Sequence, residues 1–413
     1  MFFTSTAPAR EPAREESSVK PEASRRLVSV DAYRGFVMLL MASDGLMIPS
    51  VARDLPSHHV LQILAGQLDH VQWAGCCLWD MIQPSFTFIV GVALPFSLAK
   101  RRARGERFGF MLTHAMWRSL LLIALGIFLR SIGRRQTNFT FEDTLTQIGM
   151  GYTFLFLLAW CKPRTQIIAV AAILFGYWLL FALYPLPSPD FSYSSVGVSH
   201  SWLAQHGLHG FANHWGKNSN AAAAFDVWFL NHFPRSSRFA FNGGGYLTLS
   251  FIPTLGTMIL GLLVGQLMKS DRKPSRKVLA LLVAGAVGLG VGMLLDKTGV
   301  CPVVKRIWTP SWTIYSAGWA CLMLAGFYAV IDWIGFRGWA FPLVVVGMNS
   351  IAMYCLADGG FRSFIFSNLR TNLGAHAFRF AGAYEPVVEF SVVLTILWLV
   401  CFWMYRRKIF LRI

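Results

Sequence analysis

A histidine and a carboxylate stand close together in the stretch LDHVQWAGCCLWDMIQPSF, residues 68–86. An imidazole titrates near neutral pH and can accept a proton from an attacking amine or hydroxyl. A carboxylate beside the imidazole can fix its tautomer. His70 and Asp80 are therefore candidate catalytic residues for a group transfer. The simpler interpretation is a solvated histidine at the end of an apolar segment.

Two arginines lie within otherwise apolar segments. Asp31 and Arg34, in SVDAYRGF, are three residues apart and therefore share one face of a helix. They predict either an ion pair that anchors the end of the helix or a place where Arg34 binds an anion. Arg118 has a similar depth in a later apolar segment. Because guanidinium groups bind phosphate through charge-assisted hydrogen bonds, Arg34 and Arg118 are candidate phosphate ligands.

Other polar side chains in apolar segments have simpler explanations. Gln147 and Asn349 are of the kind that forms hydrogen bonds between membrane helices. The stretch KRIWTPSWTIYS, residues 305–316, combines two cations with Trp308 and Trp312. It is interpreted as an aromatic belt with snorkelling cations, and the rim of a ligand site is the alternative.

Membrane helices are the elements that must position these residues. Of the 413 residues, 55% are hydrophobic and 14% are charged, whereas soluble chains carry roughly 25% charged residues. The net charge of +17 is attributed to basic cytoplasmic loops, and nucleic-acid binding is discounted. Residues 1–26 are polar and predict a disordered cytoplasmic tail, and 27–413 predict one transmembrane domain.

Ten segments are long and apolar enough to cross a bilayer, which takes about 20 residues. The segments are 31–51, 75–99, 110–130, 144–161, 165–184, 247–268, 278–296, 312–332, 340–357 and 385–405. An even number places both termini on one side. Lys and Arg are denser on the side of the N-terminus, which predicts that both termini are cytoplasmic. The predicted fold is an all-α polytopic bundle in the plasma membrane.

The spacing of cysteine and histidine predicts no metal site. The seven Cys lie mostly in apolar runs and are interpreted as small packing residues, without zinc or disulfides. Half of the ten His lie within 185–246, where no strong metal motif occurs. This segment is interpreted as a long extracytoplasmic loop that covers the mouth of the bundle.

An ordered set of motifs resembles the heparan-α-glucosaminide N-acetyltransferase family, including bacterial relatives without the large luminal domain. The resemblance extends from Arg26 to the C-terminus. Its motifs are SVDAYRGF, His70-x-x-Trp73-x-Gly75 followed by Asp80 and Pro84, TPSWTIYSAGW and GMNSIAMY. The opening motif alone is weak, because other membrane glycan acyltransferases begin with a similar element. The ordered set is much more specific.

The resemblance implies transfer of acetyl from cytoplasmic acetyl-CoA to the amino group of an extracytoplasmic glucosamine-type sugar, without a metal. It implies that His70 is catalytic, that Asp80 supports it and that Trp73 contacts the substrate. His70 would either deprotonate the acceptor amine or carry the acetyl group briefly.

On the donor side, the resemblance leads us to expect that Arg34 and Arg118, with Arg101 and Arg102, hold the phosphates of acetyl-CoA. Asn349 or Trp312 would line the thioester end. The lipid bilayer is the expected surrounding, and a homodimer is compatible with the sequence.

Departures from the family pattern lie on the acceptor side. Asp44 stands where an Asn is often found soon after the first helix, and it becomes the matching substrate-binding candidate. His58 and His59 lengthen the following loop. An Asp-Pro-Glu-Gly element of the family reads Phe-Asn-Gly-Gly-Gly at 241–245. These differences put the acceptor in question more than the acetyl-CoA chemistry.

Two other functions remain open at this point. An O-acyltransferase of cell-envelope polysaccharide would use the same donor and a similar histidine. A secondary transporter of a sugar or an anion would be expected to show internal repeats and interrupted helices near mid-membrane. We find no convincing similarity between the two halves of the sequence, which argues mildly against transport.

Overall fold

The computed structural model describes residues 27–374 and 376–411, and within these ranges it contains helices but no strand. Ala74 and Val304 form an isolated antiparallel bridge. The predicted all-α polytopic membrane bundle is confirmed. The predicted tail, 1–26, lies outside the described residues.

The α-helices are joined by turns and by loops, and the longest connection, between α7 and α10, contains α8 and α9. The bounds of the α-helices are α1 Val28–Ala42, α2 Ile48–Asp54, α3 His59–Gln67, α4 Ile82–Ala103, α5 Phe108–Ser131, α6 Thr144–Leu158, α7 Pro163–Ala182, α8 His200–His206, α9 Ala221–Phe229, α10 Phe251–Lys269, α11 Pro274–Lys297, α12 Pro310–Tyr328, α13 Phe341–Met348, α14 Ser350–Asp358, α15 Phe361–Leu373 and α16 Glu385–Arg406.

Membrane-spanning length distinguishes three kinds of helix. In the part of the chain that the structure describes, seven helices are long and apolar enough to span a membrane. Two bent helix pairs, α1 with α2 and α13 with α14, raise that number to nine. The predicted segment 144–161 coincides with α6, whose 15 residues rise only about 22 Å against a hydrocarbon core of roughly 30 Å. The count of ten spans therefore stays a prediction.

Glycines allow the central helices to approach closely. A Cβ atom added to Gly261 of α10 would lie 2.1 Å from the carbonyl oxygen of Phe88 in α4, and one added to Gly91 would lie 2.0 Å from that of Met258. Small residues at membrane-helix crossings favour such contacts because the backbones themselves pack. α4 and α10 thereby form the centre of the main buried cluster.

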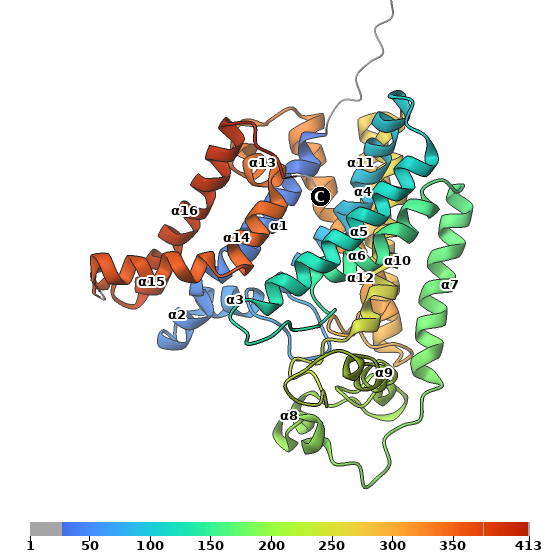
Figure 1. Cartoon of the computed structure of the whole chain (residues 1–413), viewed down its shortest axis with the longest axis vertical. Coiled ribbons are helices and arrows are strands. Elements are labelled where there is room, and N and C mark those ends of the chain that lie inside the picture. The colour runs from blue at the N-terminus through green and yellow to red at the C-terminus, as the bar shows by residue number, and fades with distance from the viewer. Residues whose placement is uncertain (1–26, 375, 412–413) are drawn as a thin grey trace, which may run out of the picture.

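The two ends of the bundle differ in character. The start of α1 and the end of α16 lie at the same end, and α8 and α9 of the long 185–246 connection lie at the opposite end (Figure 1). That connection is folded rather than open, since Trp215 within it is fully buried. The cytoplasmic placement of the termini remains a prediction.

A left-handed turn separates α1 from α2. Asp44, Gly45, Leu46 and Met47 all have φ between +48° and +61°, and the helices on either side are bent by 45°. Left-handed φ is uncommon for residues other than glycine, Asn and Asp. The turn directs the chain into α2 and α3, which lead to His70.

Candidate active site

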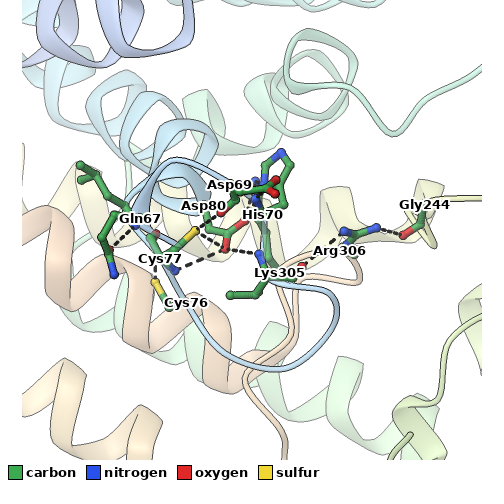
Figure 2. Close-up of polar contacts among 11 residues, drawn as sticks. Gln67, Asp69, His70, Cys76, Cys77, Asp80, Gly244, Lys305 and Arg306 are labelled. Carbon is green, nitrogen blue, oxygen red and sulfur yellow. Dashed lines mark hydrogen bonds and ion pairs between the residues drawn. The ribbon is translucent and has the colours of Figure 1, made fainter. Parts of the chain in front are cut away.

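The two catalytic candidates, His70 and Asp80, contact each other in the structure. His70 follows α3, and Asp80 lies in the single 3-10 turn Trp79–Met81 that opens into α4. The Nδ1 atom of His70 is 2.7 Å from Oδ1 of Asp80 (Figure 2). The imidazole remains about one-third exposed, whereas the carboxylate is buried. One end of the ring is therefore held and the other remains accessible.

Lys305 is the third member of this cluster. Its Nζ atom lies 3.2 Å from Oδ1 of Asp80 and 3.3 Å from Nδ1 of His70 (Figure 2). Lys305 is 5% exposed. Because a buried ammonium group is unfavourable without a counter-charge, its pairing with Asp80 accounts for its position.

The second oxygen of Asp80 accepts hydrogen bonds from the chain that surrounds it. The backbone N–H groups of Val71 and Cys77 each lie 3.3 Å from Oδ2. The sulfur of Cys77 lies 3.0 Å from Oδ2 and 2.7 Å from the backbone oxygen of Asp69, so its one hydrogen is shared between these two acceptors. Burial and the negative charge of Asp80 raise the pKa of the Cys77 thiol to about 11, so Cys77 stays protonated and remains a donor.

Backbone contacts hold the Lys305 loop against the His70 loop. Ala74 bridges Val304, and the N–H of Gly75 donates to the carbonyl of Val303 at 2.9 Å. Gly75 has φ of +119°, a conformation that other residues rarely adopt. Thr309 completes the arrangement, because its hydroxyl caps the N-terminus of α12 and also accepts from the N–H of Val304.

The hydrogen bonds favour one tautomer of His70. Asp80 pairs as a carboxylate with the ammonium group of Lys305, so it acts as a hydrogen-bond acceptor toward the ring as well. Nδ1 must then carry the hydrogen, which leaves a lone pair on Nε2 at the accessible end of the ring. Such an imidazole can accept a proton or attack an acyl carbon.

Comparison with known proteins gives a long but distant similarity. The chain is 23% identical over 437 residues to heparan-alpha-glucosaminide N-acetyltransferase of Homo sapiens and 22% identical over 445 residues to that of Mus musculus. The chain is similar to heparan-alpha-glucosaminide N-acetyltransferases. The alignments cover 94% and 96% of this chain but 60% and 62% of those proteins, so the chain spans about three-fifths of their length. No protein-family model matches it.

The residues expected on the acceptor side of a heparan-alpha-glucosaminide N-acetyltransferase have different surroundings. Trp73 is 1% exposed and donates through its indole N–H to the carbonyl of Trp215, so it joins the His70 loop to the 185–246 connection. Asp44 is partly exposed and lies 3.4 Å from Arg362 of α15. The turn that contains Asp44 packs near Leu68, two residues before His70.

The two residues expected at the thioester end lie apart from each other. Trp312 is fully buried and packs in one cluster with Trp308 and Met81. Met81 directly follows Asp80 in the chain. Its indole N–H has no hydrogen-bond partner among the described residues. Asn349 instead sits at the break between α13 and α14, where its amide group bonds the backbone of Ile409 and Leu411. The polar atoms of Asn349 thus hold the C-terminal chain.

The two arginines expected to bind phosphate both contact neighbouring side chains. Arg34 lies 3.7 Å from Asp31, the anchoring ion pair that the sequence offered as one alternative. Arg118 stacks over the ring of Tyr152 and donates to its hydroxyl at 2.9 Å.

A cavity of about 330 Å³ lies at the end of α4 that is farthest from Asp80. Arg102 and Lys269 contribute positive charge there, and Arg102 stacks on Trp160 with its guanidinium carbon 3.9 Å from the ring centroid. The lining residues come from the ends of α4, α6 and α10 and are Pro95, Leu98, Ala99, Arg102, Ala159, Gln266, Lys269 and Ser270. Arg102 was among the expected phosphate ligands.

Lys305 is the site residue that the sequence interpretation missed. The stretch 305–316 was assigned to an aromatic belt with snorkelling cations, but Lys305, Trp308 and Trp312 are buried. The sequence did contain a signal for such a residue, because a carboxylate such as Asp80 at membrane depth requires a cation or hydrogen-bond donors as partners. The alternative interpretation of this stretch, the rim of a ligand site, agrees better with its position beside His70.

Proposed function

We propose that the chain is a transmembrane acetyltransferase that moves acetyl from acetyl-CoA to the amino group of a glucosamine-type sugar. The observation that carries the proposal is His70, held at Nδ1 by buried Asp80 while its opposite end stays accessible. The similarity to heparan-alpha-glucosaminide N-acetyltransferases selects acetyl transfer among the reactions that such a histidine can serve. The proposal includes a plasma-membrane location.

The reaction needs one proton acceptor at the site. The acceptor amine attacks the carbonyl carbon of the thioester, the carbon–sulfur bond breaks, and coenzyme A leaves as a thiol after protonation. In direct transfer, Nε2 of His70 takes the proton from the attacking amine and returns one to the leaving sulfur. If His70 is itself the nucleophile, Nε2 attacks the thioester carbon and the carbon–sulfur bond breaks, so coenzyme A leaves as a thiolate. The amine then attacks the acetyl carbon, the bond from Nε2 to that carbon breaks, and the released Nε2 accepts the amine proton and passes it to the thiolate. Asp80 orients the ring in both routes.

The donor is proposed to enter from the end of the bundle that carries the Arg102 cavity. Arg102 and Lys269 supply positive charge for phosphate groups there. The cavity lies about 30 Å along α4 from Asp80, by the rise of the helix, so the donor must extend through the bundle to reach His70. The unpartnered indole N–H of Trp312 is a candidate donor of a hydrogen bond to the thioester carbonyl.

The acceptor is proposed to approach from the end covered by the 185–246 connection. The accessible side of His70 lies at this end, where Trp73 supports the loop and the Asp44 turn packs nearby. Asp44 is the candidate group for contact with the sugar, because its carboxylate is 42% exposed and can accept hydrogen bonds from hydroxyl or ammonium groups.

The test is acetyl transfer by purified protein in detergent or lipid discs, with acetyl-CoA and glucosamine as substrates. We expect wild type to release coenzyme A and to form N-acetylglucosamine, and His70→Ala to lose at least about a hundredfold in kcat. His209→Ala, which changes an exposed histidine of the long connection, is the matched control and should retain activity.

Three results would contradict the proposal. Folded His70→Ala protein with wild-type turnover would remove His70 from the mechanism. If acetyl appeared only on sugar hydroxyls, the reaction would be O-acetylation. If no acceptor were acetylated while vesicles containing the protein moved a sugar, the chain would be a transporter.

A further inference from the structure

Lys305 places a second charge directly beside the reacting imidazole. Its Nζ atom is 3.3 Å from Nδ1 of His70 and 3.2 Å from Oδ1 of Asp80, so a single carboxylate oxygen faces both groups. The loop contacts of Ala74 with Val304 keep the ammonium group in this place. The lysine therefore belongs to the charge balance of the site as well as to its packing.

The balance differs between the two protonation states of His70. With a neutral imidazole, the charges of Asp80 and Lys305 cancel. Protonation of Nε2 would place an imidazolium beside the ammonium group of Lys305, with one carboxylate to serve both. Two cations within hydrogen-bond distance repel each other, and the repulsion is weakly screened here because Lys305 and Asp80 are buried.

We propose that Lys305 is a positioning residue that keeps His70 unprotonated. It does so by neutralising Asp80, which alone would favour the imidazolium form. The carboxylate of Asp80 can then fix the tautomer of His70 without promoting protonation of Nε2. This assignment rests on the proposed function only in treating His70 as the reacting group.

Asp80 and Lys305 are the charged groups that contact the ring of His70, and three other polar groups lie around it. Asp69 accepts from the backbone N–H of His70 through a carboxylate that is itself exposed, so solvent screens its charge. Cys77 is an uncharged thiol, as its raised pKa requires. Arg306 directs its guanidinium group to the carbonyls of Gly244 and Val71.

Diethyl pyrocarbonate provides a test that needs no acetyl transfer, because it acylates unprotonated imidazole. Purified protein is treated over a range of pH, and modification of His70 is measured by peptide mass spectrometry, with exposed His209 as the internal reference. We expect Lys305→Gln to raise the pH of half-maximal His70 modification by about one unit, with no change at His209. Lys305→Arg keeps the charge and should match wild type.

A purely structural role for Lys305 predicts a different pattern. If Lys305→Gln folds and the reagent modifies its His70 with the wild-type pH midpoint, the proposal is overturned. If that variant does not fold, the double variant Asp80→Asn with Lys305→Gln is compared with Asp80→Asn alone. Removal of the ammonium group should give the double variant the higher midpoint, and equal midpoints contradict the proposal. The double variant Asp80→Asn with Lys305→Gln should return the midpoint toward wild type, because both charges are removed.

Transfer measurements separate this proposal from the proposed function. At pH values below the midpoint, Lys305→Gln should transfer acetyl about tenfold more slowly than wild type, and the two should converge at alkaline pH. If wild type itself transfers no acetyl, the proposed function is overturned. The pH dependence of His70 modification would then still decide the role of Lys305.

Discussion

Asp80 is the residue on which the other polar groups of the site converge. It accepts from His70, Lys305 and Cys77. Replacing it with Asn leaves the ammonium group of Lys305 buried without a counter-charge and allows the wrong tautomer of His70. We expect Asp80→Asn to lower kcat by about 10²–10⁴-fold with a smaller effect on KM for acetyl-CoA.

Asp69→Asn is the matched control for that variant. Asp69 is a neighbouring exposed residue whose carboxylate accepts from the backbone N–H of His70, whereas its backbone oxygen accepts from the thiol of Cys77. Its replacement should lower kcat by less than about tenfold. Equal losses for the two variants, measured as initial rates of coenzyme A release, would show that Asp80 has no special role.

Sequence reasoning at the residue scale found groups with a visible chemical type and missed those defined by burial. His70 and Asp80 follow from their types and short separation. Lys305 is 225 residues from Asp80 in the chain, so no local pattern could pair them. The same limit applies to Asn349, whose contacts with Ile409 and Leu411 depend on where the C-terminal chain lies.

Among the helices, the crossing of α4 and α10 allows a direct stability test. A methyl group on Gly261 would lie 2.1 Å from the backbone carbonyl of Phe88, so the helices must separate. We expect Gly261→Ala to destabilise the protein by about 1–3 kcal/mol, measured as a lower thermal midpoint in detergent. Gly290 in exposed α11 has nothing within 4 Å of the added atom, and Gly290→Ala should leave the midpoint unchanged or raise it. Similar losses in both variants would contradict close packing at this crossing.

In the left-handed turn between α1 and α2, a substitution by glycine is expected to stabilise the protein or leave its stability unchanged. Met47 has φ of +54° just before α2 begins, a conformation that costs about 1–2 kcal/mol for a residue with a Cβ atom. Met47→Gly should therefore raise the thermal midpoint or leave it unchanged, since relief of strain offsets lost side-chain contacts. Met41→Gly, within helical α1, should lower it. A lower midpoint for Met47→Gly would contradict strain in this turn.

For the whole molecule, hydropathy predicted the spanning helices but not their interruptions. Long apolar runs such as 278–296 and 385–405 fall within α11 and α16, because a bilayer imposes length and composition on each span. The bends of 45° at the Asp44 turn and 70° at Asn349 are invisible to an average over about 20 residues. The 185–246 connection was interpreted as a loop, and its helices are too short to give a periodic signal.

The 185–246 connection is joined to the bundle by a carboxyl group whose titration should affect the whole protein. Asp226 of α9 accepts at Oδ2 from the N–H of Thr248, at the entrance to α10, at 3.0 Å. Burial raises the pKa of Asp226 from 3.8 to about 7. The native state therefore holds this proton more tightly than the unfolded chain, so the stability contributed by Asp226 falls as the pH rises from about 4 to 7.

Asp226→Asn removes that titration while it retains an oxygen that can accept from Thr248. We expect the thermal midpoint of wild type to fall more steeply than that of Asp226→Asn between pH 5 and 8, with the variant the more stable protein at pH 8 by about 1–3 kcal/mol. Asp190→Asn, in an exposed part of the same connection, should keep the wild-type pH dependence. Parallel curves for wild type and Asp226→Asn would mean that the native state binds no more protons at Asp226 than the unfolded chain does in this range. Burial in the contact between the long connection and α10 would then not raise the pKa of Asp226.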